Sequence, residues 1–433
     1  MNVLIIAPEY PPRNIGGGGV VYKGLAEELE KEGHSVRVIA GNFHNRQIAG
    51  QVECISEGRV PIYFLPLLPP PKSKSFDAST YTLPALSGLG FLIKELLRSR
   101  QEVIHIHGLC HPSVDLAALL CIIMNKRYVL TCHGLPKSPL ASGMVWKTLF
   151  RVYLSMLERI VVRKAATFTA VSSSLLNECL QEGLINEKMT VIHNGYHQYA
   201  QEYTPTLARM MEKKYSLKGK RVIFSIGRLT RMKGFDYLID AMAQVSRDFP
   251  EAIAIIAGVG PHQNVLGQLI EERGLSDRVK LVGWISEQER TALYQRSEVV
   301  VVPSLEEPFG MVFLEALAMR KPVVAFKTAS ALEIIDDRID GLLVPVGDIE
   351  KLAQAIILVL SDEALRERIA ENSKSKIASF EWKDVANRYL RVYEQARETK
   401  KRTGRLKSDN NFQKEANDFP TNTENSIISG FIK

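Results

Sequence analysis

The sequence has 433 residues, of which 45% are hydrophobic and 24% charged. This balance excludes a mostly disordered chain, and the length corresponds to two or three domains of roughly 150 residues each. A formal net charge of +7 fits an anionic ligand, an anionic membrane surface or nucleic acid, and does not choose among them. The five cysteines are scattered without a Cys-x-x-Cys pair, which excludes a zinc ribbon and favours buried thiols in a reducing cytoplasm.

The N-terminus, MNVLIIAPEY, has no basic segment before its short apolar run, so no signal peptide is expected. No stretch reaches the roughly 20 apolar residues of a membrane-spanning helix. Both observations predict a cytoplasmic protein.

Short apolar segments alternate with helical patterns through the first half of the chain. The first strand is predicted at residues 3–7, and a glycine run over residues 16–19 precedes a helical pattern at residues 20–31. Further strands are predicted at residues 35–40, 103–107, 128–132, 168–172 and 190–194. Unbroken apolar strands separated by helices indicate a parallel sheet with both faces covered.

A polar, helix-compatible stretch at residues 199–220 interrupts this rhythm. A second series of strands follows at residues 221–227, 252–258, 279–284, 298–304, 321–326 and 341–345. The two series predict an α/β protein with two Rossmann-like, doubly wound parallel-sheet domains that face a cleft.

We place the first domain at residues 1–200 and the second at residues 201–379. A helix near residues 380–400 is expected to pack back on the first domain. Residues 402–433 are rich in Asn, Ser and Thr with little apolar periodicity, which predicts a disordered tail. The segment 61–71, rich in proline, is expected to be a loop that helps to set specificity.

The glycine run follows a strand and opens a helix, where backbone amides attract a phosphate and glycine permits its close approach. The pattern matches neither G-x-G-x-x-G nor a Walker sequence. Taken alone the run is a weak signal, and a mobile loop is the alternative interpretation.

The strand at residues 221–227 leads into GRLTRMKGFDYLIDA, which places Arg228 and Lys233 just past a strand and before a helix. Two cations in this position suit a diphosphate. Two ordinary surface charges would give the same spacing.

The segment PSLEEPFGMVFLEALAMRKPVVAF contains Glu307 in a loop and Glu315 on the helix that begins at Gly310. The first amides of this helix suit an anion or a hydroxyl group. The two carboxylates lie on one strand–loop–helix unit, which favours binding of a polyhydroxylated, phosphorylated ligand over the paired acids of a glycosidase. Helix capping remains the alternative for either glutamate.

Together these segments resemble the retaining glycosyltransferases of the GT-B fold, the group 1 glycosyl transferases that include sucrose synthase-like, phosphatidylinositol mannosyltransferase-like and bacterial polysaccharide enzymes. The resemblance covers residues 3 to about 395. The two segments just quoted carry most of it, and the glycine run, LTCHG at residues 130–134 and VIHNG at residues 191–195 complete it in order.

The resemblance implies a role for each matching residue in binding a nucleotide sugar. Gly18, the second glycine of the pair with Gly17, resembles the glycine whose amide approaches the donor phosphate. His133 resembles the histidine that contacts the donor sugar. Arg228 and Lys233 resemble the pair that holds the leaving diphosphate.

The remaining implied roles lie in the second domain. Glu307 resembles the carboxylate at the donor sugar, and Glu315 resembles the one that binds the ribose hydroxyls. Main-chain atoms near Trp284 would face the nucleobase. The implied catalytic residues are His133, Glu307, Arg228 and Lys233, and the implied donor-binding amides lie at Phe309, Gly310, Met311 and Val312.

The implied reaction moves a sugar, with retention of configuration, from a nucleoside-diphosphate sugar to a glycan or lipid-linked acceptor. Such a reaction serves polysaccharide, glycolipid or glycoconjugate synthesis. No Asp-x-Asp motif follows the predicted strands, so neither a metal nor another cofactor is expected. The alternatives are a sugar-nucleotide epimerase of the same architecture and a non-catalytic nucleotide-sugar binding protein.

One departure from the family pattern concerns a glycine-rich loop, where Ala329 and Ser330 stand in place of glycine while Glu333 matches the acidic position. Close main-chain approach to the diphosphate is therefore in doubt there. His105 and His107 are interpreted as core or capping residues, and His193 as a residue beside a turn.

The segment from Gly143 to Lys164 alternates apolar and basic residues at helical spacing. It resembles an interfacial helix on an anionic membrane, which would place the protein peripherally on the inner face of the membrane. A helix packed on its own sheet is the alternative. Nucleic acid is not an expected partner.

Overall fold

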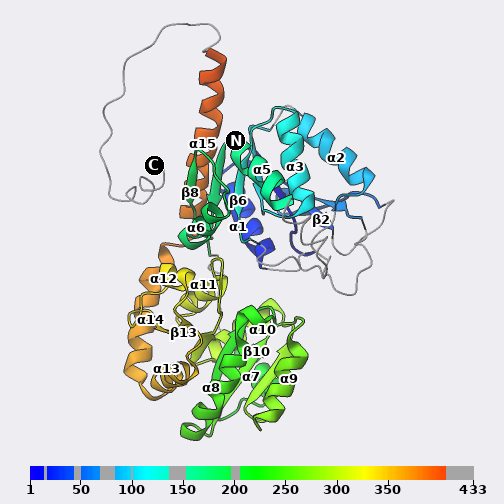
Figure 1. The fold of residues 1–433 in the computed structure, drawn as a ribbon. Helices are drawn as coiled ribbons and strands as arrows, with labels where there is room; N and C mark the ends of the chain where they lie inside the picture. Colours follow the sequence, from blue (N-terminus) through cyan, green and yellow to red (C-terminus); the bar gives the residue numbers. More distant parts are fainter. Residues whose placement is uncertain are drawn as a thin grey trace, which may run out of the picture. The chain divides into compact units, whose positions relative to one another are not determined.

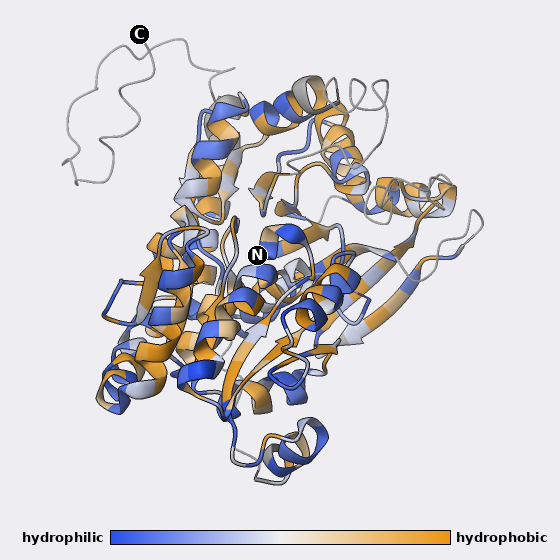
Figure 2. Ribbon diagram, turned by 60° about the horizontal axis from the view of Figure 1, so that its bottom comes forward, coloured by the Kyte–Doolittle hydropathy of each residue, from blue (hydrophilic) through white to orange (hydrophobic). Residues whose placement is uncertain are grey.

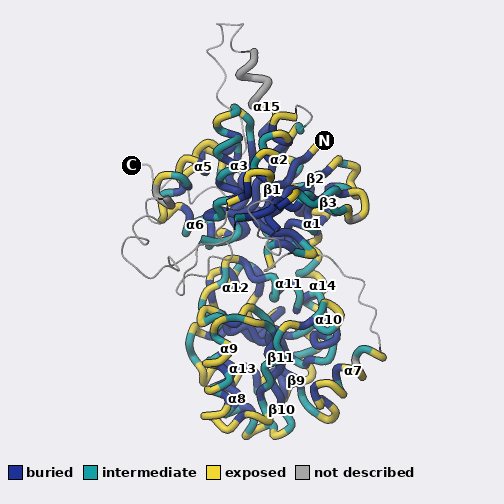
Figure 3. The backbone as a smooth tube through the Cα atoms, turned by 90° about the vertical axis from the view of Figure 1, so that its right-hand side faces the viewer, coloured by how far each residue is buried: buried dark blue, intermediate teal, exposed yellow. Residues whose placement is uncertain are grey.

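The computed structural model describes the chain except for residues 14–16, 43–49, 69–82, 99–100, 136–152, 197–204 and 406–433. Residues Met1–Ala396 form one compact unit that contains two separate sheets. The strands are mostly hydrophobic and buried, and the helices carry hydrophilic residues on their outer sides (Figures 2 and 3).

The first sheet has the strand order β3-β4-β2-β1-β5-β6-β7-β8. Neighbouring strands are parallel except for the antiparallel pair β3 and β4. The strand bounds are β1 Asn2–Ala7, β2 Ser35–Asn42, β3 Glu53–Glu57, β4 Val60–Pro66, β5 Val103–His107, β6 Val129–Cys132, β7 Thr167–Ala170 and β8 Met189–Val191. The parallel strands confirm the predicted first sheet.

Part of the proline-rich segment is not the loop that was predicted. Residues 61–66 lie in β4, which pairs with β2 on one side and β3 on the other. Pro61 and Pro66 stand near the two ends of the strand, where a missing N–H costs the ladder least. Residues 69–71 lie outside the described residues.

Helices cover both faces of this sheet (Figure 1). Their bounds are α1 Gly18–Lys31, α2 Leu86–Leu97, α3 Pro112–Ile123, the π-helical η1 Tyr153–Glu158, α5 Arg159–Lys164 and α6 Ser173–Gln181. Helix α15, Trp382–Arg405, buries Tyr389 and Tyr393 in the same cluster as residues of α1, β1 and β2. The indole of Trp382 fills the space beside Gly24 and Gly195, where an added Cβ would lie 2.3 Å and 2.4 Å from its ring.

The predicted tail begins later than expected. Helix α15 continues to Arg405, so residues 402–405 are helical, and residues 406–433 lie outside the described part of the chain.

The second sheet has the order β11-β10-β9-β12-β13-β14, with every neighbouring pair parallel, as predicted. Its strands are β9 Arg221–Ile226, β10 Ala252–Ala257, β11 Val279–Gly283, β12 Val299–Val302, β13 Val323–Phe326 and β14 Gly341–Val344. The helices are α7 Pro205–Tyr215, η2 Arg231–Lys233, α8 Phe235–Asp248, α9 Gln263–Glu272, α10 Glu287–Arg296, α11 Met311–Ala318, α12 Ala329–Ile334, α13 Ile349–Ser361 and α14 Glu363–Ala378.

The strand orders define where ligands bind. The chain leaves β9 for β10 and β11 on one side and returns to β12 on the other, so the order reverses between β9 and β12. In the first sheet it reverses between β1 and β5. Open α/β sheets bind ligands beyond the carboxyl ends of the strands at such switch points.

Candidate active site

The loops that follow β9 and β12 touch at the switch point of the second sheet. The amide of Leu305 donates to the carbonyl oxygen of Met232 at 2.9 Å. Gly234 has φ +63, and a Cβ there would lie 2.0 Å from the carbonyl oxygen of Pro303. Only glycine permits this approach of the two backbones, so it fixes one loop against the other.

Lys233 and Glu307 meet across these two loops. The Lys233 ammonium forms an ion pair with Glu307 Oε2, and Ser304 Oγ donates to the same oxygen at 3.3 Å. The Lys233 side chain is 26% exposed and that of Glu307 is 11% exposed, so both are largely buried but still accessible to solvent. Two residues predicted from separate segments therefore form one site.

A second glycine shapes the loop around Glu307. Gly310 has φ +100, and a Cβ there would lie 3.1 Å from Glu307 Cγ and 2.4 Å from the ring of Phe313. Helix α11 begins at the next residue, with Met311 and Val312 half-buried at its N-terminus. Phe309, in contrast, is buried. The loop thus brings a carboxylate beside the first turn of a helix.

The other predicted residues at this edge are exposed. Arg228 lies two residues after the end of β9 and is exposed, in keeping with a cation that an anionic ligand can reach. Trp284 follows β11 and is 76% exposed.

Glu315 is held by two side chains of α10. Arg290 Nη1 donates to Glu315 Oε1 at 3.0 Å, and Tyr294 Oη donates to Oε2 at 2.7 Å. Burial, reinforced by the Glu315 carboxylate, raises the pKa of Tyr294 well above its ordinary value, so the phenol remains a donor. Sequence reasoning missed Arg290 and Tyr294. They share one face of a helix, but nothing in the sequence links that helix to Glu315.

His133 follows β6 in the first domain and contacts another histidine. Its Nε2 lies 3.0 Å from Nδ1 of His107, and its ring meets that of Tyr22 edge-on, with centroids 5.0 Å apart. Burial, together with the neighbouring His111, lowers the pKa of His133 to about 3. The imidazole is therefore neutral at physiological pH.

The two histidines of β5 lie behind His133. His105 is buried, with Nδ1 2.7 Å from Tyr393 Oη and Nε2 2.7 Å from Thr131 Oγ1. His107 is buried beside it, with ring centroids 3.9 Å apart. Both are core residues, as interpreted from the sequence, but the contact of His107 with His133 was missed. The H-x-H spacing, which puts both rings on one face of a strand, was the available signal.

The glycine pair lies at the start of α1. Gly18 is the first helical residue, and a Cβ there would lie 2.7 Å from Tyr22 Oη. Gly17 is exposed, with no atom within 4 Å of an added Cβ. Gly16 lies outside the described residues. Gly17 is therefore accessible at its Cα, whereas the Tyr22 hydroxyl occupies the space beside Gly18.

Glu333 contacts the first domain. Its carboxylate accepts hydrogen bonds from the amides of Ser173 and Ser174 at 2.8 Å each, at the N-terminus of α6, and lies 3.2 Å from His193 Nε2. Burial alone would raise the pKa of Glu333, but the hydrogen bonds from His193 and the two amides lower it below its ordinary value. A carboxylate at a helix N-terminus is a stabilising contact, and it gives this acidic position a partner within the protein.

The amphipathic segment is described only in part. Its first ten residues, up to residue 152, lie outside the described part of the chain, and the rest forms η1 and α5. Met156 is 63% exposed and Ile160 47% exposed, one helical turn apart. In the part of the chain that the structure describes, no helix is both long and apolar enough to span a bilayer.

Two family models match successive parts of the chain. The model for Glycosyltransferase Family 4 matches residues 15–197, and the model for Glycosyl transferases group 1 matches residues 208–376, which include Lys233 and Glu307. Together the two models cover most of the chain and identify it as a glycosyltransferase. Enzymes of these families transfer a sugar from a nucleotide-sugar donor to an acceptor.

Relatives of this glycosyltransferase extend over nearly its whole length. An uncharacterized glycosyltransferase of Methanocaldococcus jannaschii is 29% identical over 92% of this chain and 99% of its own. Sucrose-phosphate synthase of Thermosynechococcus elongatus has a similar structure, with a TM-score of 0.70 and 22% identity over 91% of this chain and 99% of that one. HepE of Anabaena, solved with UDP and glucose, has a TM-score of 0.68 and 21% identity over 93% and 100% of the two chains. These similarities confirm the predicted GT-B fold.

Proposed function

We propose that the protein is a retaining, metal-independent hexosyltransferase that moves a sugar from a nucleoside-diphosphate sugar to a hydroxyl of a glycan or lipid-linked acceptor. Its product would enter polysaccharide, glycolipid or glycoconjugate synthesis. The observation that carries the proposal is the meeting of Lys233 and Glu307 at the switch point between β9 and β12.

Departure of the diphosphate is the step that these charges assist. As the glycosidic bond breaks, negative charge grows on the phosphate oxygens. Lys233 and Arg228, on the loop after β9, would stabilise that charge in place of a metal ion. Lys233 would then exchange part of its contact with Glu307 for the phosphate, which frees the carboxylate to accept a hydrogen bond from the donor sugar.

The rest of the donor would lie along the same edge of the sheet. Glu315, held by Arg290 and Tyr294, offers its oxygens to the ribose hydroxyls. Trp284 is exposed beyond the neighbouring β11, and its main chain would face the base. Because the similar structure of HepE contains UDP and glucose, a uridine diphosphate sugar is the first donor to test.

Retention would follow from attack on the face that the diphosphate leaves. An oxocarbenium-like sugar forms between the departing phosphate and the acceptor hydroxyl, and a phosphate oxygen takes the acceptor proton. His133, neutral because its pKa is about 3, would contact the donor sugar without adding positive charge.

The test is release of nucleoside diphosphate from a panel of donors, with and without candidate acceptors, in the presence of EDTA. We expect release that requires an acceptor and survives EDTA, and a product of unchanged anomeric configuration by NMR. A product formed without acceptor would instead identify an epimerase. Tight donor binding without turnover would identify a binding protein.

We place the enzyme in the cytoplasm, peripherally on the inner face of the membrane. The support is the described end of the amphipathic segment, where Met156 and Ile160 are exposed alongside Arg159, Arg163 and Lys164. The full chain should co-sediment with anionic vesicles at low salt and less at high salt. Ile160→Ser should weaken this binding, while Ile185→Ser, at a residue that is 62% exposed elsewhere, should not. Equal recovery with neutral vesicles would contradict the proposal.

A further inference from the structure

The contact between His107 and His133 is a hydrogen bond between two ring nitrogens, of which one must carry the proton. His107 ends β5 and His133 follows β6, two neighbouring parallel strands, and the contact runs from His107 Nδ1 to His133 Nε2 at 3.0 Å. One nitrogen must donate and the other must accept. The direction of this hydrogen bond decides which nitrogen of His133 carries its own proton.

Both rings are neutral, so each carries a single proton. Burial lowers the pKa of His107 well below its ordinary value, and the neighbouring His105 and His133 lower it further. The pKa of His133 is about 3 for a similar reason. Two arrangements remain: either His107 Nδ1–H donates to His133, or His133 Nε2–H donates to His107.

The second nitrogen of His107 distinguishes the two arrangements. Nε2 of His107 is buried and has no hydrogen-bond partner among the described residues. If His133 were the donor, the proton of His107 would sit on this Nε2 as a buried, unpaired N–H, which is rare and costly in proteins. If His107 is the donor, only a lone pair is left without a partner.

The surrounding rings hold the pair in place. His105 packs against His107 with the rings tilted by 40°, and Tyr393 and Thr131 contact both nitrogens of His105. The ring of Tyr22 contacts both members of the pair, with centroids 4.9 Å from His107 and 5.0 Å from His133. Rotation of either ring would break several of these contacts at once.

We propose that His107 is a positioning residue that donates Nδ1–H to His133, so that His133 carries its proton on Nδ1 and offers it as a hydrogen-bond donor to the donor sugar. This inference rests on the proposed function only for the sugar contact. The tautomer itself follows from the two rings and the unpartnered nitrogen. A ring with the opposite tautomer would present a lone pair at Nδ1, which can only accept a hydrogen bond from a sugar hydroxyl and cannot donate one.

The tautomer is measurable without any substrate. The full chain, labelled with ¹⁵N-histidine, gives distinct imidazole patterns for rings protonated at Nδ1 and at Nε2, and His133→Gln identifies the His133 signals by their loss. We expect His133 in the Nδ1–H form. An Nε2–H form in the wild-type protein would overturn the proposal.

Two variants test the consequence for catalysis. In His107→Asn the side-chain amide takes the place of Nδ1–H, whereas His107→Phe removes the donor and keeps a ring. We expect His107→Phe to lower kcat by about 10–100-fold, as loss of an outer partner does for metal-binding histidines, with little change in donor KM. His107→Asn should retain most of the activity.

The outcomes separate this inference from the proposed function. Equal kcat values for the Asn and Phe variants would refute the positioning role. If His133→Gln kept full activity while the wild-type spectrum showed Nδ1–H, the tautomer would stand and the sugar contact would fail. If His107→Phe does not fold, the wild-type spectrum and the Asn variant still decide.

Discussion

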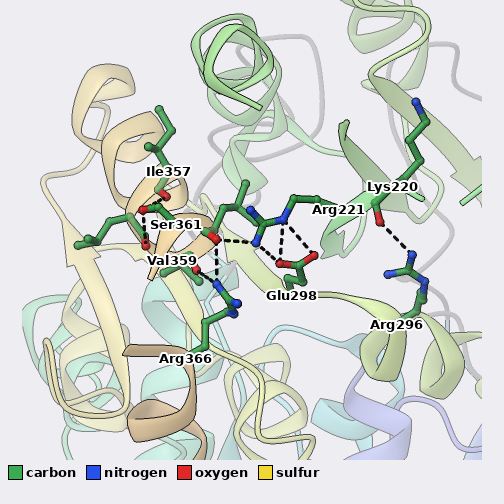
Figure 4. Close-up of polar contacts among 10 residues, drawn as sticks. Lys220, Arg221, Arg296, Glu298, Ile357, Val359, Ser361 and Arg366 are labelled. Carbon is green, nitrogen blue, oxygen red and sulfur yellow. Dashed lines mark hydrogen bonds and ion pairs between the residues drawn. The ribbon is translucent and has the colours of Figure 1, made fainter. Parts of the chain in front are cut away.

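At the amino end of the second sheet, Arg221 begins β9 and Glu298 precedes β12, and the two side chains form a bidentate pair (Figure 4). Arg221 also donates to the carbonyl of Leu360, and Arg366 donates to the carbonyls of Val359 and Leu360 at 2.7 Å and 2.8 Å. These carbonyls belong to the last turn of α13, where a helix has no partner of its own for them. The two arginines here supply hydrogen-bond donors to main-chain carbonyls at the end of α13.

At the carboxyl end of the same sheet, Lys233 and Glu307 form a pair of the same charge types from two loops. Lys233 is bound to a carboxylate, and that carboxylate lies beside Gly310, where α11 begins. An incoming phosphate can replace a carboxylate as partner, but it cannot replace the main chain of α13. Similar ion pairs therefore have a structural role at one end and suit a ligand at the other.

The largest expected effect comes from the carboxyl end. Lys233→Met should lower kcat/KM by about 100–1000-fold, the cost of losing one group that stabilises a developing oxyanion. Its thermal midpoint should fall less than that of Arg221→Met, because Lys233 pairs with a carboxylate whereas Arg221 also donates to a main-chain carbonyl. The measurement is nucleoside diphosphate release at several donor concentrations, beside a thermal melt.

Lys214→Met is the matched control, because Lys214 is a 51% exposed lysine that is also paired with a glutamate, Glu289. Its activity should stay close to that of the wild type. If Lys233→Met were as active as Lys214→Met, Lys233 would have no role in catalysis.

Much of the fold and part of this site are predictable from sequence. The strands are evident because runs such as VVVV in β12 are unbroken and β-branched. Arg228 and Lys233 come after a strand, whereas Arg221 begins the same strand, and only this position distinguishes them. The pairing of Lys233 with Glu307 is not predictable in the same way. It depends on β9 and β12 being neighbours, a fact of sheet order that chain order does not reveal.

Other contacts have no sequence signal at all. The partners of Glu315, Arg290 and Tyr294, lie on a preceding helix, and Glu333 contacts the N-terminus of α6 about 160 residues earlier in the chain. The pairing of β3 with β4 was missed because two prolines normally argue against a strand. In each case tertiary packing, not local pattern, decides the outcome.

A smaller effect is expected at the amino end of the second sheet, where a substitution should lower stability and leave activity unchanged. Arg221→Met removes hydrogen bonds to Glu298 and to the carbonyl of Leu360, so the free energy of unfolding should fall by about 1.5–3 kcal/mol. The activity of the folded protein should be unchanged. Urea unfolding, with activity measured below the transition, checks both statements.

Arg273→Met is the control for this second experiment. Arg273 is 46% exposed and pairs with Asp240 on the surface, so its loss should cost less than about 1 kcal/mol. A loss of activity in Arg221→Met without a loss of stability would reverse the assignment of the two ends.

The smallest effect concerns Lys321, which lies just before β13 and donates from Nζ to the carbonyl of Gln295 at 2.7 Å. Burial lowers its pKa to about 8, a shift that nearby Glu298 opposes and Arg296 reinforces. Between about pH 8 and the ordinary lysine pKa of about 10.4, the unfolded chain holds a proton that the folded chain has released. Lys321 therefore makes the free energy of unfolding rise with pH in this window, by at most about 1.4 kcal/mol per pH unit.

Lys321→Met should lack this contribution, so the difference in stability between wild type and variant should shift in favour of the wild type from pH 8 to pH 10. At pH 7 the two should differ by less than about 1 kcal/mol, because the methionine loses a hydrogen bond but avoids a buried charge. Taking the difference cancels the buried tyrosines and cysteines, which titrate in both proteins. Lys374→Met, at an exposed position of α14, should give a flat difference. A flat difference for Lys321→Met as well would mean that the Lys321 ammonium is solvated and that its pKa is not lowered.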